Sequence, residues 1–377
     1  MRAKYLLYSF ISLLLFATSC KKDDKEEPPF PLKDDLPEFY LAAASVDWGT
    51  LLPEYKMIAN NSSQISLPQD LDFNPSQKNQ LWVVNKGTEN TGSSSVTFTD
   101  PGEASQTSKY IKDGNSWHFM SLTSALAFSP NGNWATSPNV LDANHGGGRY
   151  TGPALWSSDF SIYGIIGNPP TQLKNGSHLD MVHQSPYCMG IASEKDNIFW
   201  VFDGYYNNII RYDFAADHGP GNDYHDDAKL RRYNEVTVKR DPNVPSHLIL
   251  DKDRKWLYIV DGGNKRILRM DITTGSVSSS LPPVNEKVAE YSKMSGVTWE
   301  IFYDQGLNKP CGIEINSNRL FVSDYETGEI ICLDVNTKKE LARINTGTKG
   351  IMGLKIYNNR LWYVNAIDNT LMQVVPR

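Results

Sequence analysis

Residues 309–334 read KPCGIEINSNRLFVSDYETGEIICLD, and this stretch contains three short strands separated by two turns. The second strand ends in Asp324 and the third in Asp334. Short runs of β-branched and aromatic residues between Gly, Asn and Asp turns are typical of antiparallel strands. The same order recurs, with first strands at residues 70–73, 125–128, 190–192, 247–250 and 353–356. The sequence therefore predicts a repeat protein built from six similar sheet modules.

Most repeats leave room for a fourth strand, which we expect at residues 109–111, 161–166, 230–238, 276–281 and 340–345. The sixth repeat reaches Arg377 before a fourth strand, but the strand-like run Tyr55–Ile58 precedes the first repeat. An N-terminal strand that completes the last sheet leaves no free sheet edge. We therefore expect an all-β fold: a six-bladed β-propeller over residues 40–377, with circular closure by an N-terminal strand.

The composition agrees with this fold and excludes some functions. Of the 377 residues, 40% are hydrophobic and 21% are charged, so the chain can bury a large core and general disorder is excluded. Nine Trp, 19 Tyr, 27 Gly and 21 Pro favour strands and turns over a helical bundle. The net charge is −6 at pH 7 without a basic block, so we expect no nucleic-acid partner.

The first 19 residues have the pattern of a signal peptide. A basic start, Met1–Lys4, precedes a mostly apolar run that is shorter than the roughly 20 residues of a membrane span. The run ends ATSC, which resembles the lipobox of bacterial lipoproteins, and this resemblance implies lipidation of Cys20. The alternative is an ordinary secretory signal with a chance Cys.

Residues 20–39 are expected to form a lipidated and disordered tether. This segment is rich in charged residues and Pro, and it cannot bury enough surface to fold. The letters KKDD at residues 21–24 resemble the export signal of surface-displayed lipoproteins in some Gram-negative bacteria. We therefore expect an outer-membrane lipoprotein of a Gram-negative bacterium, facing the periplasm or the cell surface and attached to the membrane through the lipid alone.

Three cysteines follow Cys20 in the chain, namely Cys188, Cys311 and Cys332. In an oxidising compartment an odd number allows at most one disulfide, and the sequence leaves open whether one forms. The chain contains no CxxC motif, so we expect no zinc site built from thiolates.

The last four repeats resemble NHL-type repeats. The resemblance rests on Lys309–Ile313, on Leu320–Asp324, and on Trp256–Asp261 followed by Asn264–Ile267. It covers roughly residues 60–377 and is degenerate in the first two repeats. The resemblance implies a six-bladed β-propeller and says little about activity, because propellers carry many functions.

Three histidines are candidate metal ligands. His118 and His183 each lie seven residues before the start of a first strand, so we expect matching places on adjacent blades, and His247 starts the next first strand. Three such side chains at the channel mouth could hold Zn²⁺ with an open position. NHL propellers include the peptidyl-hydroxyglycine amidating lyase, whose zinc is held by channel-facing His, and the resemblance transfers to these residues by blade position alone. The alternative is that these histidines are polar residues at the rim of the channel, hydrogen-bonded to the backbone or to water.

Other polar residues are candidates for contact with a substrate. Arg149, Tyr187 and Asp203 could orient or protonate a substrate. Asp203 also recurs as Asp261 in the next repeat, which favours a turn cap that accepts backbone N–H bonds. The loop 217–227 is dense in Asp and His, and we expect it on the opposite face as a divalent-ion site or a solvated loop. These patterns establish no cofactor and leave Zn²⁺ and Ca²⁺ as candidates.

The long link over residues 282–309 is the expected ligand wall. It contains Trp299 and Tyr303, and aromatic side chains suit the recognition of sugars or peptides. His145, in the Gly-rich turn of the second repeat, is a further candidate ligand-binding residue. The alternative to a wall or lid over the channel is a helix packed on the rim of the propeller.

Three functions are compatible with these features. The leading hypothesis is recognition of a peptide, a glycan or an envelope protein at the channel mouth, without chemistry, because no catalytic motif is present. The second is a metal-dependent lyase or hydrolase that uses the three histidines. The third is a structural component of an envelope complex. Metal analysis of the purified protein separates the first two.

Overall fold

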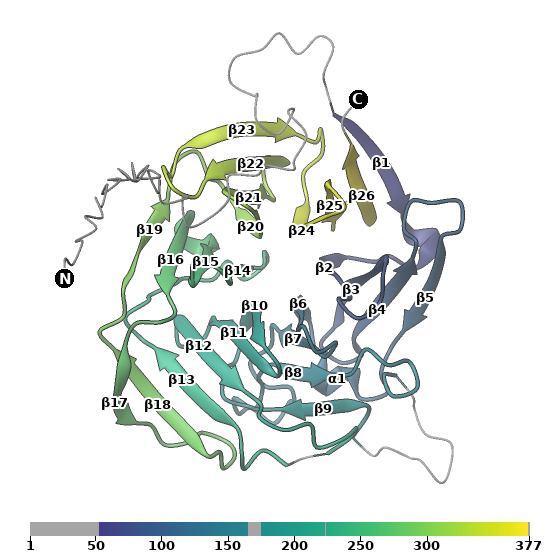
Figure 1. Cartoon of the computed structure of the whole chain (residues 1–377). Helices are drawn as coiled ribbons and strands as arrows, with labels where there is room; N and C mark the ends of the chain where they lie inside the picture. The colour runs from purple at the N-terminus through teal and green to yellow at the C-terminus, as the bar shows by residue number, and fades with distance from the viewer. Residues whose placement is uncertain (1–52, 165–174, 223, 376–377) are drawn as a thin grey trace, which may run out of the picture.

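The computed structural model describes residues 53–164, 175–222 and 224–375, which form six sheets in a ring (Figure 1). The predicted signal peptide (residues 1–19), Cys20 and the predicted tether (residues 20–39) lie outside these residues. The innermost strands are β2 (Pro68–Phe73), β6 (Thr123–Phe128), β10 (Cys188–Lys195), β14 (Leu248–Asp251), β20 (Pro310–Asn316) and β24 (Ile351–Tyr357). All six overlap the predicted first strands, and the six-bladed β-propeller is confirmed.

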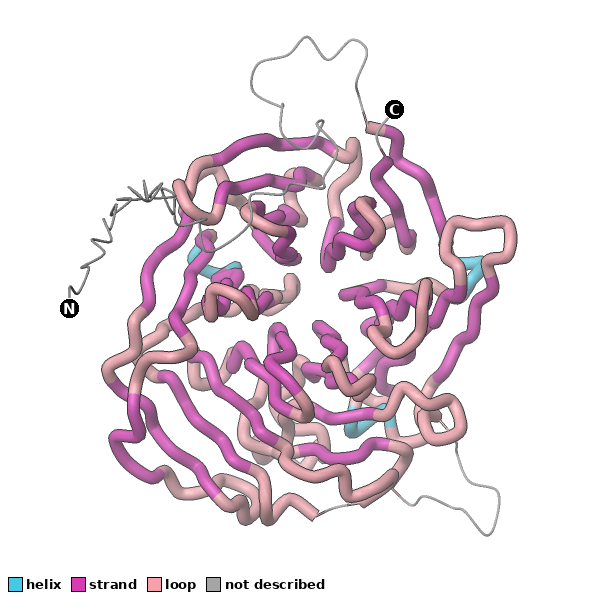
Figure 2. The backbone as a smooth tube through the Cα atoms, in the orientation of Figure 1, coloured by secondary structure: helices cyan, strands magenta, loops and turns pink. Residues whose placement is uncertain are grey.

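Further strands follow outward in each blade and are drawn in magenta in Figure 2. Blades one to three contain β3 (Gln80–Thr88), β4 (Gly92–Thr99), β5 (Thr107–Ile111), β7 (Trp134–Pro138), β8 (Ala154–Trp156), β9 (His178–Met181), β11 (Ile198–Asp203), β12 (Asn208–Asp213) and β13 (Lys229–Tyr233). Blades four to six contain β15 (Trp256–Asp261), β16 (Arg266–Asp271), β19 (Trp299–Tyr303), β21 (Arg319–Asp324), β22 (Glu329–Asp334), β23 (Glu340–Asn345), β25 (Arg360–Asn365) and β26 (Thr370–Val375). Three short helices lie in the links: η3 (Asn61–Ser63), α1 (Ser116–Phe119) and η4 (Gly262–Asn264).

The ring closes through the N-terminal strand β1 (Glu54–Ala59), as predicted. This strand pairs antiparallel with β26, with Tyr55 opposite Val374 and Lys56 opposite Gln373. The sixth blade therefore has the order β1-β26-β25-β24, in which the two ends of the described chain share one sheet. The pairing covers the edge of β26, which would otherwise expose unpaired backbone groups.

Adjacent blades pack through layers of aromatic side chains. The rings of Trp82 in the first blade and Trp134 in the second lie 5.1 Å apart, and within the second blade the rings of Trp134 and Trp156 lie 5.9 Å apart. Tyr163 contacts the same layer, and all four side chains are buried. Large aromatic side chains bury much apolar surface in such contacts, so neighbouring blades hold one another in place.

Two of the predicted fourth strands are wrong. In the second blade the outer strand is β9, not residues 161–166. Residues 276–280 form β17, which does not belong to the fourth blade. It pairs with β18 (Glu290–Ser295), and this hairpin extends the third blade to six strands, because β18 pairs parallel with β13. The link 282–309 is therefore not a helix on the rim of the propeller, since it contains β18 and β19.

Burial explains why β19, rather than β17, completes the fourth blade. All five residues of β17 are exposed, so this strand buries no apolar side chain. The strand β19 buries Phe302 and packs Trp299 against the core of the third and fourth blades. Across the β16–β19 pair, Arg269 Nε also donates to Glu300 Oε1 at 2.7 Å. Burial of aromatic surface thus selects the later strand.

The described cysteines form no disulfide. Cys188, Cys311 and Cys332 are free and buried, which answers the question left open by the sequence. Burial raises the pKa of Cys332 to about 12, so this thiol stays protonated and unreactive at neutral pH. Among residues 53–164, 175–222 and 224–375, no helix has the length and apolar character needed to cross a membrane.

Candidate functional site

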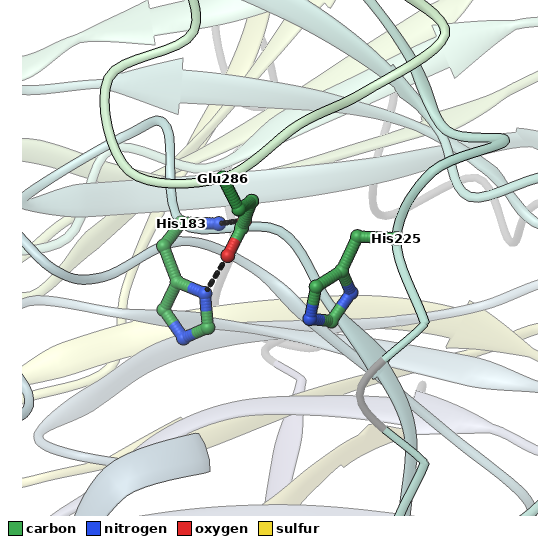
Figure 3. Close-up of side chains that lie close together, drawn as sticks. All are labelled: His183, His225 and Glu286. Atoms are coloured by element: carbon green, nitrogen blue, oxygen red, sulfur yellow. Dashed lines mark hydrogen bonds and ion pairs between the residues drawn. The ribbon is translucent and has the colours of Figure 1, made fainter.

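A polar cleft brings together histidines from three loops. The helix α1 carries His118, the segment after β9 carries His183, and the loop between β12 and β13 carries His225. The β17–β18 loop adds Glu286, and Figure 3 shows His183, His225 and Glu286 grouped together. The cleft has a volume of about 460 Å³ and is lined by these four residues and Asn115, Trp117, Phe119, Asn144, Tyr150 and Asn175.

The distances within this cluster are short. His118 Nε2 lies 3.1 Å from His183 Nε2, and His183 Nδ1 lies 2.7 Å from Glu286 Oε2. The backbone N–H of His183 donates to the other oxygen of the same carboxylate. His225 Nδ1 lies 2.6 Å from Asp180 Oδ1 on β9. One ligand atom each from His183, His225 and Glu286 lies within 4.8 Å of the others, a spacing that suits a single metal ion.

The electrostatics favour a neutral imidazole beside an ionised carboxyl. Burial lowers the pKa of His118 to about 4, and the nearby His183 lowers it as well, so His118 is neutral at pH 7. Burial by itself would raise the pKa of Glu286, but the hydrogen bonds that it accepts from His183 outweigh burial, and the pKa lies below its usual range. A neutral imidazole is the form that binds metal ions.

Aromatic rings hold the cleft in shape. Tyr150 stacks on His183 with ring centroids 3.8 Å apart and an interplanar angle of 22°. Trp117 is 36% exposed at the rim, and its ring faces that of His145 at 6.2 Å. His145 also lies 3.5 Å from Glu89. His145 is thus a rim residue beside the cleft, in the left-handed backbone conformation (φ 54°).

The structure brings His118 and His183 together as predicted, but it places His247 elsewhere. His247 immediately precedes the innermost strand β14 and is buried. Its Nε2 donates to the carbonyl of Ser124 at 3.0 Å, and its Nδ1 lies 3.5 Å from Asp70 Oδ1. The expected three-histidine cluster is corrected on this point, because His118 and His183 lie in links between blades, whereas His247 lies next to the centre of the ring.

Asp203 has a structural role in this fold. Its Oδ1 accepts backbone N–H bonds from Tyr205 at 3.0 Å and Tyr206 at 2.9 Å, which is the turn cap that the repeats favoured. Its Oδ2 pairs with the buried Arg232 at 2.7 Å. With both oxygens occupied and no exposed surface, this carboxylate is unsuited to meet a substrate.

Arg149 and Tyr187 make other contacts. The guanidinium of Arg149 lies 3.3 Å from the hydroxyls of both Tyr205 and Tyr206. The ring of Tyr187 packs under the guanidinium of Arg240, whose central carbon is 3.8 Å from the ring centroid. Arg149 precedes the cleft residue Tyr150 in the chain, but its charged group points to the tyrosine pair.

The expected aromatic wall of Trp299 and Tyr303 is wrong in its position. Both residues lie on β19, the outer strand of the fourth blade. The hydroxyl of Tyr303 donates to Glu340 Oε2 of the fifth blade at 2.7 Å. The burial of aromatic surface at the blade edge accounts for these residues, so they are not placed to cover the mouth of the ring.

Sequence reasoning missed His225, Asp180 and Glu286 as site residues. The loop 217–227 was singled out for its Asp and His content but was expected on the opposite face. Its His218 does pair locally, with Asp227 at 3.0 Å, whereas His225 reaches the cleft. The signal for His225 was present in the loop composition, but nothing in the sequence related it to His183.

No family model matches the chain, and no curated protein matches it. Its fold is similar to the solved structure of a luciferin-regenerating enzyme (TM-score 0.54, 11% identity, 86% of this chain and 95% of that one). It is also similar to an auxiliary nutrient binding protein from Bacteroides thetaiotaomicron (TM-score 0.54, 11% identity, 90% and 75%). A third similar structure is the calcium-binding protein regucalcin from Agrobacterium tumefaciens (TM-score 0.52, 11% identity, 86% and 94%). At this identity the likeness shows the six-bladed propeller fold.

Proposed function

We propose that this protein is a metal-dependent lyase or hydrolase whose divalent ion is held by His118, His183 and His225. The observation that carries the proposal is a chain of three imidazoles that line one cleft: His118 Nε2 lies 3.1 Å from His183 Nε2, and ligand atoms of His183 and His225 lie within 4.8 Å of each other. Three histidines with one open position are a common catalytic metal site. Such an ion polarises a carbonyl group or lowers the pKa of a bound water.

The donor set fits Zn²⁺ better than Ca²⁺. Two imidazole nitrogens bound to one tetrahedral Zn²⁺ at about 2.0–2.1 Å lie about 3.3 Å apart. The two Nε2 atoms of His118 and His183 are 3.1 Å apart, close to this spacing. Ca²⁺ takes six to eight oxygen ligands, whereas this cluster offers three imidazoles and the carboxylate of Glu286. The calcium site of the regucalcin neighbour therefore gives no guide to this cleft.

The test is zinc binding by metal-free protein, measured by competition with a chromophoric chelator. We expect one zinc per wild-type chain. His118→Ala, His183→Ala and His225→Ala should each weaken binding by more than about 100-fold, beyond what loss of an outer-shell partner costs. His145→Ala is the matched control, because this rim histidine lies outside the cluster, and we expect unchanged affinity. A wild-type protein that binds no zinc would overturn the proposal.

A second candidate function is recognition of a peptide, a glycan or an envelope protein at the same cleft without a metal. The propeller fold, whose structural neighbours include a nutrient-binding protein, supports a binding role. The feature that favours this candidate is the exposed ring of Trp117, which lines the cleft together with Tyr150, because such rings suit planar or apolar ligand faces. Zinc-free wild-type protein that still binds a ligand through Trp117 would select this function.

We also propose that the propeller is held at the outer membrane by a lipid on Cys20, facing the periplasm or the cell surface. The support is the sequence pattern of residues 1–24. We expect wild-type protein in the membrane fraction and Cys20→Ala mostly in the soluble fraction, as followed by immunoblot and intact mass. Equal distribution of the two proteins would contradict lipid attachment.

A further inference from the structure

The loop of the β17–β18 hairpin, which extends the third blade, is hydrogen-bonded to the segment that carries His183. The N–H of Val284 donates to Gln184 Oε1 at 2.8 Å. The side-chain amide of Asn285 donates to the backbone carbonyl of His183. Glu286 then accepts both the backbone N–H and the Nδ1–H of His183, as the dashed lines of Figure 3 show. Three successive residues of the hairpin thus hold two successive residues of the link.

Both carboxylate oxygens of Glu286 are in hydrogen bonds with His183. Each of its oxygens accepts one hydrogen bond from that residue, and the side chain is 12% exposed. A carboxylate is an acceptor only, so His183 Nδ1 must carry the proton. In the neutral imidazole the lone pair then lies on Nε2, the atom that faces His118 Nε2 at 3.1 Å.

His225 has the same arrangement with a different partner. Its Nδ1 lies 2.6 Å from Asp180 Oδ1, and the side chain of Asp180 is 1% exposed. The same reasoning puts the proton on His225 Nδ1 and the lone pair on Nε2. Figure 3 shows one ring nitrogen of His225 on the side that faces His183.

We infer that Glu286 and Asp180 are positioning residues and not metal ligands. Each accepts the Nδ1–H of one histidine and directs its Nε2 toward the ion. The β17–β18 hairpin, which extends the third blade, supplies Glu286 to the site. Metal-bound histidines commonly give their second N–H to such a carboxylate, which fixes the tautomer and the ring orientation. This inference rests on the proposed metal site.

Glu286→Gln tests the inference because it keeps the shape of the side chain and replaces one acceptor oxygen with an NH₂ donor. The Gln oxygen can accept the backbone N–H of His183, and its NH₂ group then faces His183 Nδ1. This moves the imidazole proton to Nε2, the nitrogen that should face the metal. We expect zinc affinity to fall about 10- to 100-fold. We also expect X-ray absorption to show three imidazole nitrogens at about 2.0 Å in both proteins.

Asp180→Asn repeats the test at His225 and keeps the inference testable if Glu286→Gln fails to fold. The matched control is Asp227→Asn. This residue pairs with His218 at 3.0 Å in the same β12–β13 loop but lies outside the cluster, so zinc affinity should not change. A carboxylate oxygen among the zinc ligands, or loss of zinc as severe as in His183→Ala, would make Glu286 a ligand and overturn the inference.

The tautomers of His183 and His225 can be determined in the metal-free protein. In the metal-free wild type, ¹⁵N NMR of the imidazoles should show His183 and His225 protonated at Nδ1. Glu286→Gln should move the His183 proton to Nε2 and leave His225 unchanged. If wild-type protein shows these tautomers but binds no zinc, the proposed function fails while the positioning role stands. An unchanged His183 tautomer in Glu286→Gln contradicts the positioning role itself.

Discussion

Replacing Arg232 with Met is expected to lower the free energy of unfolding by about 3–5 kcal/mol. Arg232 is 3% exposed, and its Nη1 donates to Asp203 Oδ2 at 2.7 Å and to Asn208 Oδ1 at 2.8 Å. Its other nitrogens donate to the hydroxyl of Tyr291 and to the carbonyl of Gln184, each at 2.9 Å. Methionine would fill part of the space but leave the fully buried carboxylate of Asp203 without a counter-charge.

The neighbouring Arg231 is the matched control for this experiment. It lies on the same strand, β13, and pairs with Glu290 at 2.8 Å, but the two side chains are 38% and 25% exposed. An ion pair in such contact with water contributes about 0–1 kcal/mol, so Arg231→Met should have a small effect. Chemical denaturation followed by Trp fluorescence gives both values. Equal destabilisation by the two changes would show that the buried network around Asp203 is not what stabilises this blade.

Removing β1 is expected to abolish the folded monomer. A chain that starts at residue 61 lacks Glu54–Ala59, so it loses the antiparallel pairing with β26 and the packing of Tyr55 and Ala59 in the core. The bare edge of β26 is then free to pair with other chains. We expect aggregation in size-exclusion chromatography and loss of a cooperative thermal transition.

A chain that starts at residue 53 is the reference, because it keeps the whole closing strand. Adding a peptide of residues 53–60 to the shorter chain should restore part of the monomer if strand pairing is the cause. A shorter chain that elutes as a monomer with an unchanged melting temperature would show that the ring is stable while open.

The sequence predicted the blades well because each blade depends on local patterns. The first strands and the turn caps at Asp203 and Asp324 follow from strand patterns and turn residues within one repeat, and the closing strand follows from the fourth strand that the sixth repeat lacks. Asp324 Oδ1 indeed accepts the backbone N–H groups of Glu326 and Thr327, both at 3.1 Å. The outer strands of the second and fourth blades were exceptions, and in the fourth blade both β17 and β19 were available as strands. Only the burial of Phe302 and Trp299 distinguishes them.

The candidate site was predicted in part. Equal spacing before two first strands correctly paired His118 with His183, since equivalent positions of adjacent blades lie side by side. The same argument failed for His247, which belongs to the start of a strand rather than to a link. Equal spacing could not identify His225 or Glu286, because these residues lie in loops whose lengths differ from blade to blade and which therefore have no equivalent positions in the repeat.

By itself the sequence determined the number of sheet modules, their inner strands and the strand that closes the ring, because these depend on interactions between residues close in the chain or repeated along it. Only the tertiary structure decided which loops meet over the second and third blades. His183 and Glu286 are 103 residues apart and touch because the β17–β18 hairpin pairs with β13 of the third blade instead of with β16 of the fourth. The strand that pairs with β16 is β19 and not β17, because β19 buries more apolar surface in the folded ring.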